Sequence, residues 1–211
     1  MLRQVKKQKV FKQKFTTGFT LVELLVTLSI FVIVTGIVLF NQNKFNSSIV
    51  LTNLSYDVAL TIRQAQTFGT GGKIVGFEGI KPTYGVHLET GINNKIVVLF
   101  ADRLKNNNNN TVNNYKFDGF SSGGICDQIN SECLEKSLLT RGNYIYKICE
   151  YGTSVCYSKL DITFKRPKSE PVIKADDKDI STTGVVITLA ALDGATRTVT
   201  VGPLGNINLS R

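Results

Sequence analysis

An apolar segment from Gly18 to Phe40 constrains this chain more than any other feature of its sequence. Between Phe19 and Phe40 the only charged residue is Glu23. A helix of this length is about 33 Å long, enough to cross the roughly 30 Å hydrocarbon core of a bilayer. We therefore expect residues 19–40 to form a transmembrane helix.

The residues before this segment are basic. Residues 1–18 have no acidic residue and contain Arg3, Lys6, Lys7, Lys9, Lys12 and Lys14. By the positive-inside rule, this charge places the N-terminus in the cytoplasm and the C-terminal domain outside. An ordinary secretory signal is cleaved after its apolar segment, at a small-x-small site. Here the small residue, Gly18, precedes the apolar segment instead.

Glu23 is the unusual residue within the apolar segment. A carboxylate costs about 2–3 kcal/mol at the centre of a spanning helix and less near an end. We therefore expect Glu23 to have a cationic partner.

The run from Lys14 to Leu25, KFTTGFTLVELL, resembles the class III signal of type IV pilins and type II secretion pseudopilins. The resemblance implies that a membrane-embedded prepilin peptidase cleaves between Gly18 and Phe19, and that the new amino group of Phe19 is methylated. It also implies that Glu23 is the glutamate of the family's assembly motif. A free amino group at Phe19 is cationic at neutral pH. It is therefore a suitable partner for Glu23 when one subunit docks beside another in a helical filament.

A plain signal anchor with an incidental glutamate is the alternative interpretation of this segment. It requires the glycine, the phenylalanine and the glutamate to fall at the same spacing by accident.

Length and charge agree with one anchor and one globular domain. Removing residues 1–18 from the 211-residue chain leaves 193 residues. The whole chain has 25 Lys+Arg and 16 Asp+Glu, a net charge of +9, and loss of the six basic leader residues lowers it to +3. The basic charge is thus mainly a signal of membrane topology, and it is weak evidence for nucleic-acid binding.

The apolar helix is expected to continue as an amphipathic helix over residues 41–68. Apolar residues recur there at intervals of three and four, at Leu51, Leu54, Val58, Ile62 and Ala65. Gly69, Gly71 and Gly72 end the pattern. Residues 53–66 are also similar to the end of the first helix in minor pseudopilins of the GspH/FimT type, which carry a leucine, an acidic residue, an arginine and an alanine at about this spacing.

Residues 69–211 are expected to form a β-rich head. Strand patterns cover residues 83–88, 95–102, 144–148, 160–164, 184–190 and 197–201, with a last short strand before residue 209. Asp193-Gly194 is a strong hairpin signal. Asn106 to Asn110 predicts a surface loop, and residues 121–139 have little periodicity. The predicted class is α+β, with a long N-terminal helix packed on an antiparallel sheet as in the pilin fold.

Four cysteines lie in the exported half of the chain, where thiols can be oxidised. Six residues separate Cys126 from Cys133, and six separate Cys149 from Cys156. Sequence alone allows three connectivities, of which we favour the two local pairs. A zinc site is the alternative, but these gaps are wider than the two to four residues usual in structural zinc sites.

The sequence contains little that points to catalysis. His87 is the only histidine and lies in an alternating strand pattern, and the chain has neither a phosphate-binding glycine loop nor a nucleophile elbow. Asp176, Asp177 and Asp179 form an acidic cluster that is either an ordinary solvated turn or a calcium site, although the spacing of a complete calcium loop is missing. We expect no enzymatic activity, no cofactor and no bound metal.

Two functions are consistent with these features. The first is a structural subunit of a type IV pilus or of a type II secretion pseudopilus, held in the inner membrane and then assembled with other pilin subunits. The GspH/FimT resemblance favours a minor subunit. The alternative is a FimT-like minor pilin that binds DNA during uptake, with basic residues in its loops contacting phosphates: Lys165, Arg166, Lys168, Lys174, Arg197 and Arg211.

Overall fold

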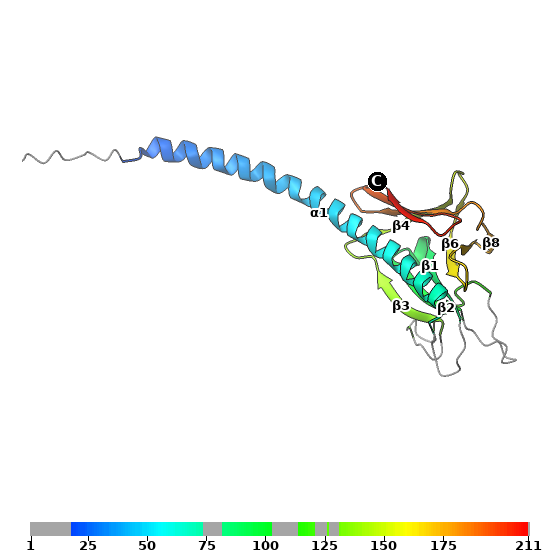
Figure 1. Ribbon diagram of the computed structural model, residues 1–211. Helices are drawn as coiled ribbons and strands as arrows, with labels where there is room; N and C mark the ends of the chain where they lie inside the picture. Colours follow the sequence, from blue (N-terminus) through cyan, green and yellow to red (C-terminus); the bar gives the residue numbers. More distant parts are fainter. Residues whose placement is uncertain (1–17, 74–81, 103–113, 121–125, 127–130, 211) are drawn as a thin grey trace, which may run out of the picture. The chain divides into compact units, whose positions relative to one another are not determined.

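The computed structural model describes residues 18–73, 82–102, 114–120, 126 and 131–210 (Figure 1). The chain divides into two compact units, residues 1–43 and residues 44–211. One helix, α1 (Leu21–Gly71), begins in the first unit and ends in the second. The second unit contains all the strands of the described residues.

The end of α1 is set by a glycine in a left-handed conformation. Gly72 has φ of +64°, and the N–H of Lys73 donates to the carbonyl of Phe68 at 3.2 Å. This is the hydrogen bond of a Schellman cap, in which glycine is preferred because it lacks a Cβ. Gly69, one turn earlier, lies directly against the backbone of Phe164, so the helix end approaches the sheet closely.

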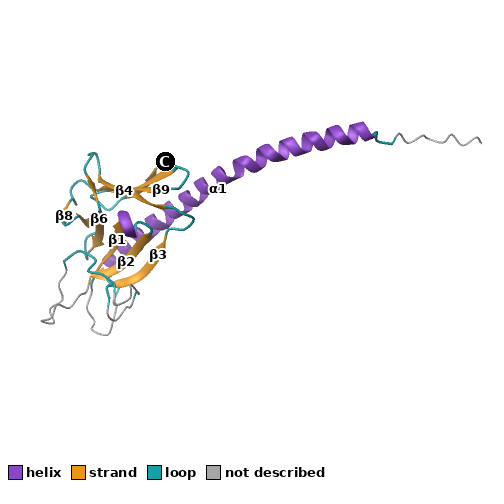
Figure 2. Cartoon of the chain, turned by 180° about the vertical axis from the view of Figure 1, so that it is seen from behind, coloured by secondary structure: helices purple, strands orange, loops and turns teal. Residues whose placement is uncertain are grey.

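The strands form two antiparallel sheets (Figure 2). The six-stranded sheet has the order β3-β2-β1-β6-β7-β8, and the five-stranded sheet has the order β11-β10-β9-β4-β5. Their bounds are β1 (Thr83–Glu89), β2 (Ile96–Asp102), β3 (Cys133–Leu138), β4 (Tyr144–Glu150), β5 (Cys156–Tyr157), β6 (Lys159–Phe164), β7 (Pro171–Ala175), β8 (Lys178–Asp179), β9 (Val185–Ala190), β10 (Thr196–Val201) and β11 (Ile207–Ser210).

One hydrophobic core joins the second part of α1 to both sheets. All five apolar residues that recur along residues 51–65 are buried there, as their spacing predicts. The same hydrophobic cluster includes Val86 and Leu160 of the six-stranded sheet and Ile187 of the five-stranded sheet. Figure 1 shows this part of the helix lying alongside both sheets.

Side-chain hydrogen bonds also tie α1 to the five-stranded sheet and its turns. Arg197 on β10 donates from Nε to Thr52 Oγ1 at 3.1 Å and from Nη2 to Ser48 Oγ at 3.0 Å. Near the other end, Gln66 Nε2 lies 3.2 Å from the carbonyl of Gly205. The helix is therefore held at both ends of its packed stretch.

A second, smaller apolar cluster covers the opposite face of the six-stranded sheet. Because successive side chains of a strand point to opposite faces, Val97 and Leu99 of β2 enter the main core, while Val98 and Phe100 enter this cluster. It also contains Cys133, with Phe117, Phe120 and Cys126 packed against it. β2 is thus buried on both faces.

The α+β, pilin-like architecture predicted from the sequence is confirmed. Every strand expected from the sequence is present, but the division into two sheets was not anticipated. Four strands were missed: β3, β5, β7 and β8. Pro171 is the first residue of β7 and pairs with Phe164 of β6. Proline is tolerated as the first residue of a strand.

The core assignment predicts a contrast between two neighbouring helix positions. Ile62 is fully buried, so Ile62→Ala should lower the free energy of unfolding by about 2–5 kcal/mol. Leu60 is 60% exposed, so Leu60→Ala should change it by less than about 0.5 kcal/mol. Denaturant unfolding of the full chain in detergent micelles measures both. Equal losses from the two variants would contradict the packing described.

Candidate functional site

The predicted processing point lies immediately before α1. Gly18 and Phe19 are exposed and outside the helix, which begins at Leu21. Thr20 caps the helix, because its Oγ1 accepts the backbone N–H of Glu23 at 3.2 Å. Cleavage at the predicted position, between Gly18 and Phe19, would therefore leave the cap of the helix intact.

Glu23 lies in the first turn of α1. A carboxylate there is favoured by the helix dipole, typically by about 0.3–1 kcal/mol. The position also puts the charge at one end of the apolar segment, where its desolvation costs less than at the centre. The structure thus places Glu23 next to the chain end that cleavage would create.

The first part of α1 can cross a membrane by its length and composition. The candidate span is Leu21–Leu39, 19 residues with a mean hydropathy of 2.6 and none of it buried within the chain. Such a helix is about 28 Å long, close to the thickness of the hydrocarbon core. Large apolar side chains are exposed along it, for example Phe31 at 68%. This surface requires lipid or neighbouring helices to cover it.

The hydroxyl groups of the span have hydrogen-bond acceptors within the helix. Thr27 Oγ1 donates to the carbonyl of Leu24 at 2.9 Å, and Thr35 Oγ1 donates to the carbonyl of Phe31 at 2.7 Å. Ser29 bonds in the same way. Because hydrocarbon offers no partners to polar groups, these bonds make the segment compatible with a bilayer.

The structure contains the two local disulfides, Cys126–Cys133 and Cys149–Cys156. The second joins directly paired residues of β4 and β5. The first joins Cys133 of β3 to Cys126, which packs against the smaller apolar cluster. Each closes a short loop, which on the chain-entropy model stabilises the fold by about 2.5 kcal/mol.

The three aspartates considered for calcium have separate partners. Asp176 accepts the backbone N–H groups of Ser158 and Lys159. Asp177 pairs with Lys116, and Asp179 accepts hydrogen bonds from Ser181. Among the described residues, no group of three or more His, Cys, Asp or Glu side chains is arranged to hold a metal.

The basic residues considered for DNA contact are divided by the fold. Lys165, Arg166 and Lys168 lie together in the exposed turn between β6 and β7. Lys174 on β7 and Lys165 both approach the ring of Tyr115, with Nζ 5.6 Å and 5.8 Å from its centroid.

The two other residues of that set do not join them. Arg197 is bonded to α1 instead, as described above. Arg211 lies outside the described residues, as does the Asn106–Asn110 segment.

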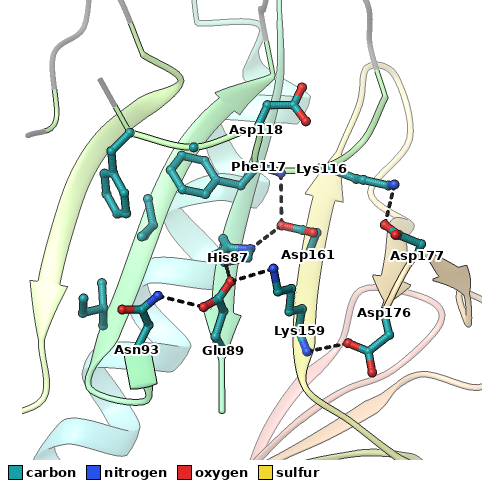
Figure 3. A pocket seen from close by; sticks show the side chains of 14 residues that line it. His87, Glu89, Asn93, Lys116, Phe117, Asp118, Lys159, Asp161, Asp176 and Asp177 are labelled. Carbon is teal, nitrogen blue, oxygen red and sulfur yellow. Dashed lines mark hydrogen bonds and ion pairs between the residues drawn. The ribbon is translucent and has the colours of Figure 1, made fainter. Parts of the chain in front are cut away.

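His87 belongs to a charged cluster on the outer face of the six-stranded sheet (Figure 3). Its Nδ1 lies 2.7 Å from Asp161 Oδ1 on β6, and its Nε2 lies 3.2 Å from Glu89 Oε1. Lys159 Nζ is 3.4 Å from the same Glu89 oxygen. The alternation of β1 puts His87 and Glu89 on one face, but only the β1–β6 pairing brings Asp161 to them. This cluster was not predicted from the sequence.

Burial alone would raise the pKa of Glu89. The hydrogen bond from Asn93, together with the charge and hydrogen bond of His87 and the charge of Lys159, outweighs burial and lowers the pKa below its usual value of 4.5. Because the folded-state pKa is lowered, the stabilisation is present above about pH 4.5 and is lost as the pH falls through the folded-state value.

Glu89→Gln should therefore destabilise the protein at neutral pH and have a shrinking effect as the pH falls below about 4.5. The free energy of unfolding of the variant and the parent chain, measured between about pH 3 and pH 7, tests this. A difference that stays constant over this range would contradict the assignment.

Comparison with known families supports the prepilin interpretation of the N-terminal segment. The family model described as the prokaryotic N-terminal methylation motif matches residues 14–39. This range contains the expected cleavage point, Glu23 and the candidate span. Comparison with curated proteins and with solved structures finds no match to the chain. The chain therefore carries a type IV pilin-like prepilin signal, followed by an apolar helix suited to anchoring it in a membrane.

Proposed function

We propose that this protein is a structural subunit of a type IV pilus or of a type II secretion pseudopilus. Prepilin peptidase removes residues 1–18, Phe19 is N-methylated, and the subunit enters a filament through the first part of α1. The observation that carries the proposal is the match of the methylation motif to residues 14–39, with Glu23 in the first turn of a helix that can span a membrane.

The geometry suggests how the subunit would assemble. Cleavage gives Phe19 a cationic amino group, and Thr20 already caps the helix that follows. In the low-dielectric surroundings of packed apolar helices, the attraction between this amino group and a carboxylate is much stronger than in water. Glu23 of a neighbouring subunit is then the partner of the amino group, and the exposed apolar surface of the span packs against other spans.

We further propose that the subunit is a minor one of the GspH/FimT type. The support is the similarity of residues 53–66 to the end of the first helix of those proteins. The closing glycine turn after β10 and the final strand β11 also resemble the head of those proteins. The head, residues 44–211, would be displayed on the outside of the filament.

Replacement of Glu23 should separate processing from assembly. Glu23→Ala should leave cleavage at Gly18 intact but reduce entry into filaments by about tenfold or more, because the amino group of Phe19 loses its charged partner. Intact mass measures cleavage, and immunoblots of sheared filament fractions measure entry. Glu135→Ala, at an exposed glutamate on β3, is the matched control. Filament entry of Glu23→Ala at the parental level would refute the proposed pairing.

DNA binding is the second candidate function. The supporting observation is the cluster of Lys165, Arg166 and Lys168 in one exposed turn, with Lys174 and Tyr115 close by. Lysine and arginine side chains that neutralise phosphates displace counterions, so affinity for DNA would fall steeply with salt. An aromatic ring beside such cations offers a surface on which a base can stack.

Removal of the positive charges in the turn between β6 and β7 tests whether the protein binds DNA. Lys165→Gln, Arg166→Gln and Lys168→Gln combined should weaken duplex DNA binding and reduce the slope of log K against log salt by about 0.9 for each phosphate that the variant no longer neutralises. Gel shifts of the full chain in detergent at several salt concentrations measure both. Lys95→Gln, Lys136→Gln and Lys147→Gln, at exposed lysines elsewhere, form the matched control. Absence of any shift at low salt, or equal effects of the two triple variants, would remove this function.

A further inference from the structure

A cavity of about 530 Å³ lies over the outer face of the six-stranded sheet, on the side away from α1 (Figure 3). Its floor is formed by side chains of β1, β2 and β6, and its wall by residues 116–120. The His87 cluster lies within it. The assembly function proposed above uses none of these residues.

The lining of the cavity is negatively charged. It contains five carboxylates and two lysines, so its net charge is −3 with His87 neutral and −2 with His87 protonated. The carboxylates are Glu89, Asp118, Asp161, Asp176 and Asp177. The hydrogen bond from Lys116 and its charge lower the pKa of Asp177, and the pKa of Glu89 is also lowered, so both are ionised at neutral pH. A ligand of positive charge complements such a lining.

One of these carboxylates, that of Asp161, is largely buried. Asp161 is 8% exposed, and its Oδ1 receives hydrogen bonds from the His87 ring and from the backbone N–H of Phe117. The side chain of Asp161 is 11% exposed and lines the cavity, so its carboxylate is accessible to a donor bound there. Asp118, next to Phe117 in the wall of the cavity, is exposed and provides a second carboxylate.

The remaining wall is apolar and aromatic. Phe117 and Phe120 meet edge to face with their ring centroids 5.0 Å apart, and Phe117 lies 5.1 Å from the His87 ring. Ile96 and Val98 of β2 continue this surface on the floor. It offers contact to a hydrocarbon chain and, through the ring faces, attraction to a cation.

From these features we infer that the cavity binds an organic cation, a primary ammonium group carried on a short apolar chain. Asp161 and Asp118 receive the ammonium group, while Phe117 and Phe120 contact the chain. The ammonium group of Lys116 pairs with Asp177 at this wall. It therefore competes with a bound ammonium group for the negative charge of the cavity. A metal ion fits less well, because the described residues contain no group arranged to hold one.

The single histidine makes a direct measurement feasible, since the labelled imidazole of His87 gives one signal from the cavity itself. The full chain, without a histidine tag, is labelled at histidine and studied by NMR in detergent micelles at fixed pH and ionic strength. Titration with n-butylamine, which is protonated at neutral pH, should shift the His87 signal saturably. n-Butanol and sodium butyrate, which have a similar chain but no positive charge on it, should not.

Variants that remove either a negative or a positive charge from the cavity provide a second test of the inference. Asp118→Asn should weaken n-butylamine binding about tenfold, because a charge-assisted hydrogen bond is removed. Lys116→Gln should strengthen binding, because a competing cation is removed. Asp57→Asn, at an exposed aspartate on α1, removes the same charge away from the cavity and should have no effect.

The ammonium group can belong to a lysine side chain of a partner protein or to a free small amine. A second probe, Nα-acetyl-lysine N-methylamide, distinguishes these two sources. A saturable shift with this probe would identify a lysine side chain of a partner protein as an acceptable ligand. Binding of n-butylamine alone would identify free small amines. No saturable shift with either probe, or equal effects of Asp118→Asn and Asp57→Asn, would overturn the inference.

Discussion

The structure depends on a single helix whose two parts have opposite requirements for burial. Residues 21–39 of α1 expose an apolar surface that only lipid or other apolar helices can cover. Residues 51–65 of the same helix bury one stripe in the core of the head, against both sheets. The main core of the head therefore includes this part of α1.

Much of this organisation is readable from the sequence because it rests on local patterns. The intervals between Leu51 and Ala65 identified the buried stripe, and Asp193-Gly194 identified the β9–β10 hairpin. The signal at residues 14–25 needs no tertiary structure at all, since a glycine, a phenylalanine and a glutamate at fixed spacing define it. The structure adds that the helix begins at Leu21, with Thr20 as its cap and Glu23 in its first turn.

The features that escaped prediction depend on contacts between distant segments. β5 and β8 have two residues each, and β3 is a mostly exposed strand with no clear alternation. Their strand conformation comes from pairing with β4, β7 and β2. The His87 cluster was missed for the same reason, because Asp161 reaches it only through the pairing of β1 with β6. Residues 116–120, which form the wall of the cavity, carry no periodic signal of their own.

The central claim is that the chain is a prepilin-type subunit, and its most direct test is the N-terminus of the protein in membranes. Intact mass and N-terminal sequence should be determined from cells with and without a prepilin peptidase. The account predicts a chain that begins at N-methylated Phe19 when the peptidase is present and an unprocessed chain when it is absent. A chain that still begins at Met1 with the peptidase present, or one that begins beyond residue 36, would contradict it.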